Sequence, residues 1–105
     1  MDRLDHAVVD AALAATGWSR DGDRLRRTSR HGDFVAALAF VNAVGALAED
    51  RNHHPDIAVH WDTVDLTLWT HTAGGVTQAD LDLAAAVEGL DGPDGPDGPA
   101  CAGAA

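Results

Sequence analysis

The chain has 105 residues and a formal net charge of -10 at pH 7, because 17 Asp and Glu residues face only 7 basic ones. A chain of this length accommodates one domain with a single core. The acidic balance opposes nucleic-acid binding, which depends on clustered Lys and Arg. No apolar run approaches the roughly 20 residues that a membrane span needs. The composition therefore predicts one globular domain whose partners are neither nucleic acid nor a membrane.

The amino terminus and the cysteine content indicate a compartment. Charged side chains occur near the amino terminus, where a secretory signal would need an unbroken apolar segment. The single cysteine, Cys101, has no partner in the chain for a disulfide. Both observations favour a cytoplasmic protein. Aromatic residues make up only 5% of the chain, so we expect a thin core of Ala, Val and Leu, which favours a homo-oligomer.

The first part of the chain predicts a helix and a hairpin. Apolar residues recur at helical spacing over residues 5–16, with Asp5 placed to cap the helix and Gly17 placed to end it in a left-handed conformation. Turn-forming residues then separate two short segments, 18–20 and 24–30. These segments predict a first hairpin.

A second helix is expected to follow Asp33, whose side chain can cap its start. Phe34, Leu38 and Val41 share one stripe of this helix. The helix should fade near Glu49, because a proline soon afterwards cannot continue a helix and disfavours the helical conformation of the residue before it. The residues just before that proline therefore belong to a connection.

A second hairpin is predicted from segments 57–61 and 63–71, which are dense in β-branched and aromatic residues. Alternate side chains of a strand face opposite sides of the sheet. His71 and Trp69 therefore point away from the core, on the polar face of the second segment.

A Gly-Gly turn at 74–75 precedes a third helix, for which Thr77 and Asp80 form a start that resembles a capping box. The folded unit, residues 1–90, should end with this helix. Residues 91–105 repeat Gly-Pro-Asp and then Ala and Gly, a composition that predicts a disordered tail. The order α-β-β-α-β-β-α is satisfied most simply by an α+β domain, with a four-stranded antiparallel sheet and three helices packed on one face.

Histidines, carboxylates and an aromatic residue are spaced through the second half in the order Glu49, His53, His54, Pro55, Trp61, His71 and Asp80. Adjacent imidazoles in a turn contribute little to packing and suit proton transfer, because imidazole, with an ordinary pKa of about 6.5, can occupy either protonation state near neutral pH. Carboxylates can orient such imidazoles or favour their charged forms. Since the chain has neither an HExxH nor a CxxC pattern, acid–base chemistry is favoured over a metal site.

In order and spacing, these residues resemble the signature of the pterin-4a-carbinolamine dehydratases. The similarity extends from about Trp18 to Leu90 and includes Asp33-Phe34 before the second helix. It implies the same α+β fold, assembled as a homodimer or homotetramer. It also implies a hydro-lyase that eliminates water from 4a-hydroxytetrahydropterin to give quinonoid dihydropterin, in tetrahydrobiopterin recycling and without a cofactor.

The resemblance also implies roles for individual residues. His53 and His71 resemble the acid and base of the elimination, and His54 resembles a substrate-binding group that assists catalysis. Glu49 and Asp80 resemble supporting carboxylates. A site of this kind requires His71 to lie close to the two adjacent histidines.

Each of these residues also has a structural alternative. Trp61, which offers a flat face for a pterin ring, is more often a packing residue. Asp80 can serve purely as a helix cap, and His71 can bond locally at a strand end. His53 and His54 can be ordinary turn residues.

A function from another class also stays open. The chain can be a catalytically silent, dehydratase-like binding module that dimerises or stabilises a partner protein. A thin core and an acidic surface are compatible with that function. A scaffold has no need of spaced histidines and carboxylates, however, so the pattern favours the enzyme with a pterin substrate.

Overall fold

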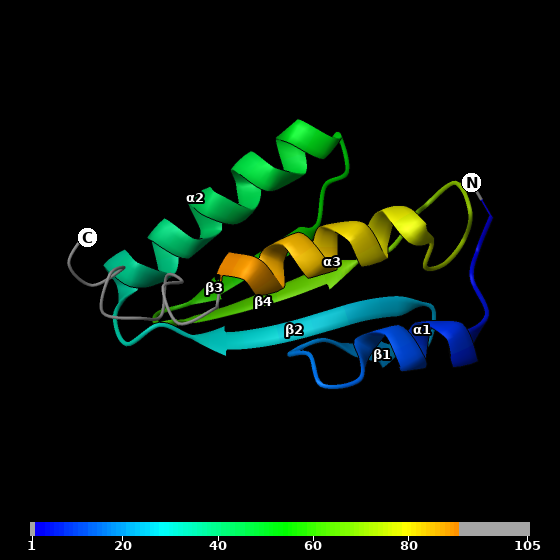
Figure 1. The fold of residues 1–105 in the computed structure, drawn as a ribbon. Coiled ribbons are helices and arrows are strands. Elements are labelled where there is room, and N and C mark those ends of the chain that lie inside the picture. Colours follow the sequence, from blue (N-terminus) through cyan, green and yellow to red (C-terminus); the bar gives the residue numbers. More distant parts are fainter. Residues whose placement is uncertain (1, 91–105) are drawn as a thin grey trace.

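The computed structural model describes residues 2–90, which form a four-stranded antiparallel sheet with three helices (Figure 1). In chain order the elements are α1 (His6–Leu13), β1 (Ser19–Asp21), β2 (Arg24–Arg30), α2 (Phe34–Arg51), β3 (Asp56–His60), β4 (Thr63–Leu68) and α3 (Gln78–Leu90). The predicted α+β class and the order of elements are confirmed. The predicted tail, 91–105, lies outside the described residues.

The sheet has the strand order β1-β2-β4-β3, with every neighbouring pair antiparallel. Strand β4 is therefore central, whereas β1 and β3 are edges. Val64, Leu66 and Leu68 alternate along β4 and are at most 1% exposed, as a strand with one buried face requires. Leu25 of β2 lies opposite Leu68 in the register, so the buried face continues across both strands.

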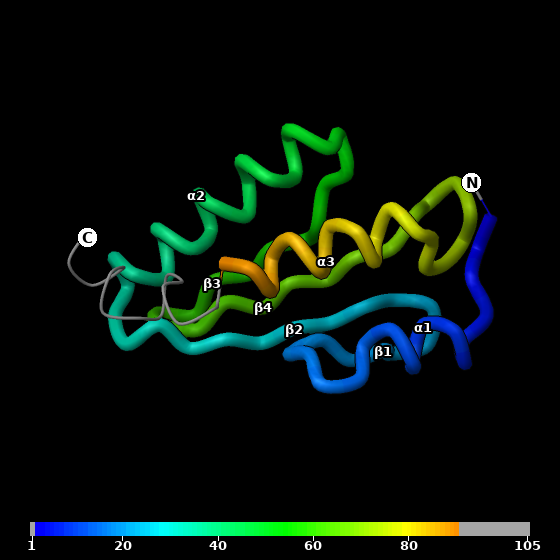
Figure 2. Tube along the Cα trace, in the orientation of Figure 1, coloured from blue at the N-terminus to red at the C-terminus, as the bar shows by residue number. Residues whose placement is uncertain are grey.

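The core lies between this face of the sheet and the helices. Figure 2 shows the path of the chain through the sheet and the helices. Phe40 of α2, Leu83 of α3 and Val9 of α1 are all fully buried in it. Burial of one large apolar side chain contributes about 1.5–3 kcal/mol. The three helices therefore share one core, and the opposite face of the sheet stays open.

The face of α2 that packs on the core differs from the predicted stripe. Its buried side chains include Phe40 and Val44, whereas Phe34 and Leu38 are 48% and 38% exposed. Helix α2 is rich in alanine and apolar around most of its circumference, so hydrophobic spacing alone does not select one face. Packing against the sheet makes that selection.

The two ends of α2 follow familiar capping chemistry. Asp33 Oδ1 accepts a hydrogen bond from the Ala36 amide at 2.7 Å, which confirms the predicted N-cap. The helix continues past Glu49 to Arg51 and ends at Asn52, whose φ of 48° is left-handed, a conformation that Asn tolerates.

None of the helices in residues 2–90 is long and apolar enough to cross a bilayer.

Helix α1 ends earlier than predicted, at Leu13, and the left-handed residue after it is Ala15 with a φ of 64°. The predicted role of Gly17 as a left-handed cap is therefore wrong. Gly17 instead lies against α3: its amide donates to Glu88 Oε1 at 3.0 Å, and a Cβ there would lie 2.8 Å from that oxygen, the end of a side chain that can move aside. The hydrogen bond joins α3 to the segment before β1.

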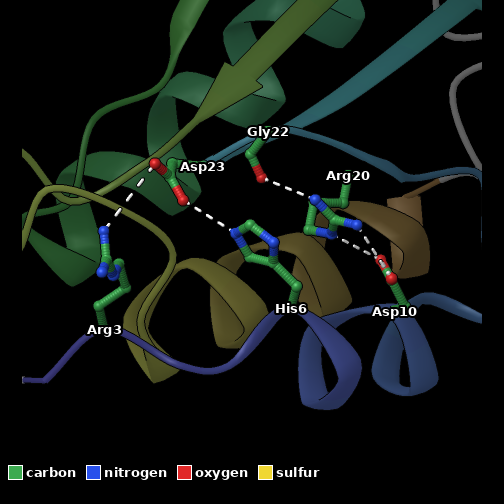
Figure 3. A network of polar contacts seen from close by, with 6 residues as sticks. All are labelled: Arg3, His6, Asp10, Arg20, Gly22 and Asp23. Carbon is green, nitrogen blue, oxygen red and sulfur yellow. Dashed lines mark hydrogen bonds and ion pairs between the residues drawn. The ribbon is translucent and has the colours of Figure 1, made fainter.

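The N-terminal segment is tied to the loop before α3 and to the turn between β1 and β2. The Leu4 amide donates to the Val76 carbonyl at 2.7 Å, and Figure 2 shows the two segments side by side. Asp23 accepts a hydrogen bond from His6 at 2.9 Å and lies 3.9 Å from Arg3 (Figure 3). The hydrogen bond from His6 lowers the pKa of Asp23 below its ordinary value.

A neighbouring ion pair joins α1 to β1. Arg20 donates to both oxygens of Asp10, at 2.8 and 3.1 Å (Figure 3). This hydrogen bonding lowers the pKa of Asp10. Because Arg20 lies opposite the core residue Leu25 in the register, α1 covers the same face of the sheet as the other helices, as predicted.

Candidate active site

An open depression of about 340 Å³ lies where the connection from α2 to β3 meets the segment after β4. Its lining combines residues 52–54 with residues 69–72. Strands β3 and β4 are antiparallel, so the start of one and the end of the other occupy the same end of the hairpin. The sheet thereby brings His71 to the same depression as His53 and His54, as the sequence-based hypothesis required.

His53 is joined to a buried carboxylate. Its Nε2 lies 2.5 Å from Asp80 Oδ1, and the two side chains are 18% and 0% exposed. The other carboxylate oxygen, Oδ2, accepts the Thr70 hydroxyl at 2.8 Å and the Thr77 amide at 2.9 Å. Both oxygens of this buried carboxylate therefore have partners, as a buried charge requires.

These contacts determine which ring nitrogen of His53 carries the hydrogen. A carboxylate only accepts hydrogen bonds, so the imidazole Nε2 must be the donor to Asp80. In the neutral imidazole the remaining nitrogen, Nδ1, then carries no hydrogen and can accept a proton. The arrangement defines which nitrogen of His53 is available for chemistry.

Asp80 combines the two roles that the sequence left as alternatives. It lies in the first turn of α3 and accepts the Thr77 amide, which is the return half of a capping box. The same side chain holds His53. Thr77 is as fully buried as Asp80, and its hydroxyl lies 2.8 Å from that of Thr70, which extends the hydrogen-bonded chain.

His54 has a carboxylate partner of a different kind. Its Nε2 lies 2.8 Å from Glu49 Oε2, but the side chains are 57% and 81% exposed. Glu49 projects from the last turns of α2, so the end of that helix supplies the pair. Exposed ion pairs contribute little to stability, about 0–1 kcal/mol. Glu49 therefore contacts His54, whereas His53 depends on Asp80.

His71 lies beyond the end of β4, which stops at Leu68 and not at His71 as predicted. The chain turns there because the Thr70 amide donates to the Gly75 carbonyl at 2.9 Å, and Gly74 takes a left-handed φ of 69°. His71 is exposed on this turn. The centroids of its ring and the Trp69 ring are 4.0 Å apart.

Trp61 does not line the depression. It occupies the turn between β3 and β4 with a φ of 55° and is 65% exposed. The five residues of β3, at about 3.4 Å each, separate this turn from the histidines by roughly 17 Å. Trp61 can therefore not serve a pterin bound at this depression of the same chain.

The aromatic residue that does line the depression is Trp69. The sequence predicts that Trp69 lies on the polar face with His71, but the motif places the flat aromatic surface at Trp61. The alternation of strand side chains was the signal that could have identified it. The side chain of Thr70, which holds Asp80, likewise had no predicted role.

No cluster of three His, Cys, Asp or Glu side chains suited to a metal ion occurs among residues 2–90. The polar groups of the depression instead form carboxylate–imidazole pairs and an imidazole–indole contact. Groups of this kind can bind a planar polar molecule, and they can donate or accept protons near neutral pH.

The fold and the depression thus define a small α+β domain with carboxylate-supported histidines. The model of the family described as pterin 4 alpha carbinolamine dehydratase matches residues 2–90, and the chain belongs to this family. Curated relatives carry the provisional name pterin-4-alpha-carbinolamine dehydratase. Those from Roseiflexus castenholzii and Thermomicrobium roseum are 49% and 48% identical over 86 and 85 residues, which cover 81% and 80% of this chain and 92% and 91% of theirs.

Solved structures support the same assignment. The transcriptional coactivator/pterin dehydratase from Brucella melitensis superposes with a TM-score of 0.79 at 31% identity, covering 84% of this chain and 97% of that one. A pterin dehydratase-like protein identified as a RuBisCO assembly factor in the alpha-carboxysome superposes with a TM-score of 0.62 at 30% identity, covering 74% and 93%. The solved structures that this chain resembles are therefore described by different functions.

Proposed function

We propose that this chain is an active dehydratase that converts 4a-hydroxytetrahydropterin to quinonoid dihydropterin and water. The observation that carries the proposal is that His53, which bonds to the buried Asp80, lies with His71 in one depression. The elimination needs one proton delivered to the departing hydroxyl and one removed from the neighbouring ring nitrogen. No electron is gained or lost, so two positioned acid–base groups suffice.

We assign the base to His53. Its Nδ1 removes the proton from the ring nitrogen of the substrate, and the electron pair of that N–H bond forms the new carbon–nitrogen double bond. The imidazole becomes a cation in this step, and it releases the proton to solvent through the open depression once the product has left. Asp80, fixed by Thr70 and Thr77, stabilises that cation without changing its own position.

We assign the acid to His71. Its imidazolium donates a proton to the 4a-hydroxyl, and the C–O bond breaks as water leaves with the bonding electrons. His71 is exposed, so it regains a proton directly from solvent after each turnover. The assignment gives the less exposed histidine the role that needs a fixed carboxylate, and the exposed one the role that needs solvent exchange.

His54 is proposed to bind the substrate and assist catalysis. It lines the depression and is held by Glu49. An exposed pair of this kind orients a polar ligand without stabilising a buried charge. We therefore expect loss of His54 to weaken substrate binding more than it slows the chemical step.

Histidine replacement tests the proposal. His53→Ala and His71→Ala should each lower the rate of dehydration by about 10²–10⁴-fold, the contribution of a positioned acid or base. The substrate is generated in situ by a pterin-dependent hydroxylase, and its loss is followed by absorbance. His60→Ala is the matched control, because His60 is exposed at the other end of β3 and pairs with Asp65.

The control variant should retain the wild-type rate, and circular dichroism should show that all the variants are folded. Folded wild-type protein that does not accelerate dehydration over buffer would refute the proposal.

The alternative function is a catalytically silent binding module that dimerises or stabilises a partner protein. The likeness to the RuBisCO assembly factor supports it, because that relative is described by an assembly role. A stoichiometric complex with one partner, formed equally by wild-type protein and His53→Ala, together with absent dehydratase activity, would favour this function.

We also propose that the chain forms a homodimer or homotetramer. Phe34, Val35 and Leu38 at the start of α2 are 48%, 57% and 38% exposed, and β3 is an open sheet edge on which Ile57 is 38% exposed. Exposed apolar groups beside an unpaired edge favour association. Sedimentation equilibrium measures the mass, and a monomer at all concentrations would contradict this proposal.

A further inference from the structure

The histidines of the depression are held in three different ways. His53 bonds to a buried carboxylate and His54 to an exposed one. Within residues 2–90, the His71 imidazole has neither a hydrogen bond nor an ion pair, and its one ring contact is with Trp69. The orientation of His71 therefore depends on Trp69.

Trp69 is in turn held by the neighbouring strand. Because Leu25 of β2 lies opposite Leu68 of β4, the residues next to them, Arg24 and Trp69, meet on the open face of the sheet. The guanidinium carbon of Arg24 lies 4.2 Å from the centroid of the Trp69 ring, within the range of a cation–π contact. The half-buried indole thus has support from two strands.

We propose that Trp69, held by Arg24, is the positioning residue that directs the His71 imidazole at the substrate. The inference rests on the proposed function, in which His71 donates a proton. An exposed histidine samples several staggered rotamers, and only some of them face the depression. A ring contact with centroids 4.0 Å apart and planes inclined at 37° selects among these rotamers.

The contact with Arg24 follows from the charge distribution of the indole. The face of an indole ring carries negative potential and attracts a cation. Arg24 makes this cation–π contact with the indole and has no ion pair among the described residues.

Substitution of the indole tests the inference. Trp69→Ala should lower kcat by about 10- to 100-fold, the effect of misplacing a reacting group by about 1 Å, with a much smaller change in KM. Trp69→Phe should recover most of the rate, because a phenyl ring keeps an aromatic face beside His71. Arg24→Gln should give a smaller loss than Trp69→Ala. Arg26→Gln is its control, since Arg26 lies on the same strand and pairs with Asp21.

An NMR measurement separates positioning from general structural support. The ring current of the indole should displace the His71 imidazole signals in the wild-type protein, and Trp69→Ala should return them to positions typical of an exposed histidine. The signals of His53 should stay unchanged. A Trp69→Ala protein with wild-type kcat, or with unmoved His71 signals, would overturn the inference. Wild-type protein without dehydratase activity would refute the proposed function instead, and the NMR signals would still report the contact.

Discussion

His53 and His54 are neighbours in sequence and each bonds to a carboxylate, yet the two pairs differ in surroundings. Asp80 is 0% exposed, whereas Glu49 is 81% exposed. The buried pair is fixed by further donors, whereas the exposed pair is surrounded by solvent and competes with water. Similar distances, 2.5 and 2.8 Å, therefore describe interactions of very different strength. Burial and the number of additional partners decide which histidine is held rigidly.

The largest effect is expected from Asp80→Asn. The amide retains the shape, but an NH₂ group facing His53 forces the imidazole Nε2 to accept and moves the hydrogen to Nδ1. His53 then has no free nitrogen with which to act as the proposed base. We expect dehydration to slow by about 10²–10⁴-fold, measured by steady-state kinetics.

The same substitution should lower the free energy of unfolding by about 1–3 kcal/mol, because a buried network loses a well-matched partner. Urea unfolding measures this change. Nitrogen chemical shifts of the His53 ring report the tautomer directly. An unchanged rate together with an unchanged tautomer would show that Asp80 acts only as a helix cap.

A much smaller effect is expected from Glu49→Gln, which makes the same chemical change at the exposed pair. The free energy of unfolding should change by less than about 0.5 kcal/mol. The rate should change by no more than about threefold, mainly through KM. A loss of kcat as large as that of Asp80→Asn would contradict the distinction between the two pairs.

The smallest effect is expected at an exposed pair that does not line the depression, Asp10 and Arg20. Arg20 lowers the pKa of Asp10 below its ordinary value of 3.8. The stabilisation is therefore present above about pH 4 and is lost as the pH falls through the lower pKa of the folded state. Asp10→Asn should be slightly less stable than wild type near neutral pH, and the difference should vanish in acid.

Urea unfolding from pH 2 to pH 7 measures this difference. Asp2→Asn is the control, since Asp2 has no hydrogen bond or ion pair among the described residues. A constant difference between Asp10→Asn and wild type at every pH would contradict the assignment of the effect to the Asp10 carboxylate.

Much of the fold could be predicted from the sequence, because its signals are local. Asp33 caps α2, and Thr77 with Asp80 caps α3, as their spacing indicated. The buried face of α2 could not be predicted, since alanine and larger apolar residues surround that helix. The predicted left-handed cap at Gly17 is wrong because the chain leaves α1 earlier, at Leu13, and takes its left-handed conformation at Ala15.

Most residues of the candidate site could be predicted from the sequence, whereas the contacts between them could not. The antiparallel hairpin explains why His53 and His71 share one depression. Which carboxylate supports which histidine depends on how α3 packs, and no spacing rule contains that information. The motif predicts Trp61 as the flat aromatic surface for a pterin, whereas the alternation of side chains along the strand favours Trp69, which lines the depression.

Asp80 bonds both to the first turn of α3 and to His53, which links fraying of that helix to the proposed catalysis. If the first turn of α3 opens, the Thr77 amide and the His53 imidazole lose the same carboxylate together. Local opening of this turn needs less free energy than global unfolding. Heating should therefore inactivate the protein before it melts, and hydrogen exchange at the Thr77 amide should follow the loss of activity.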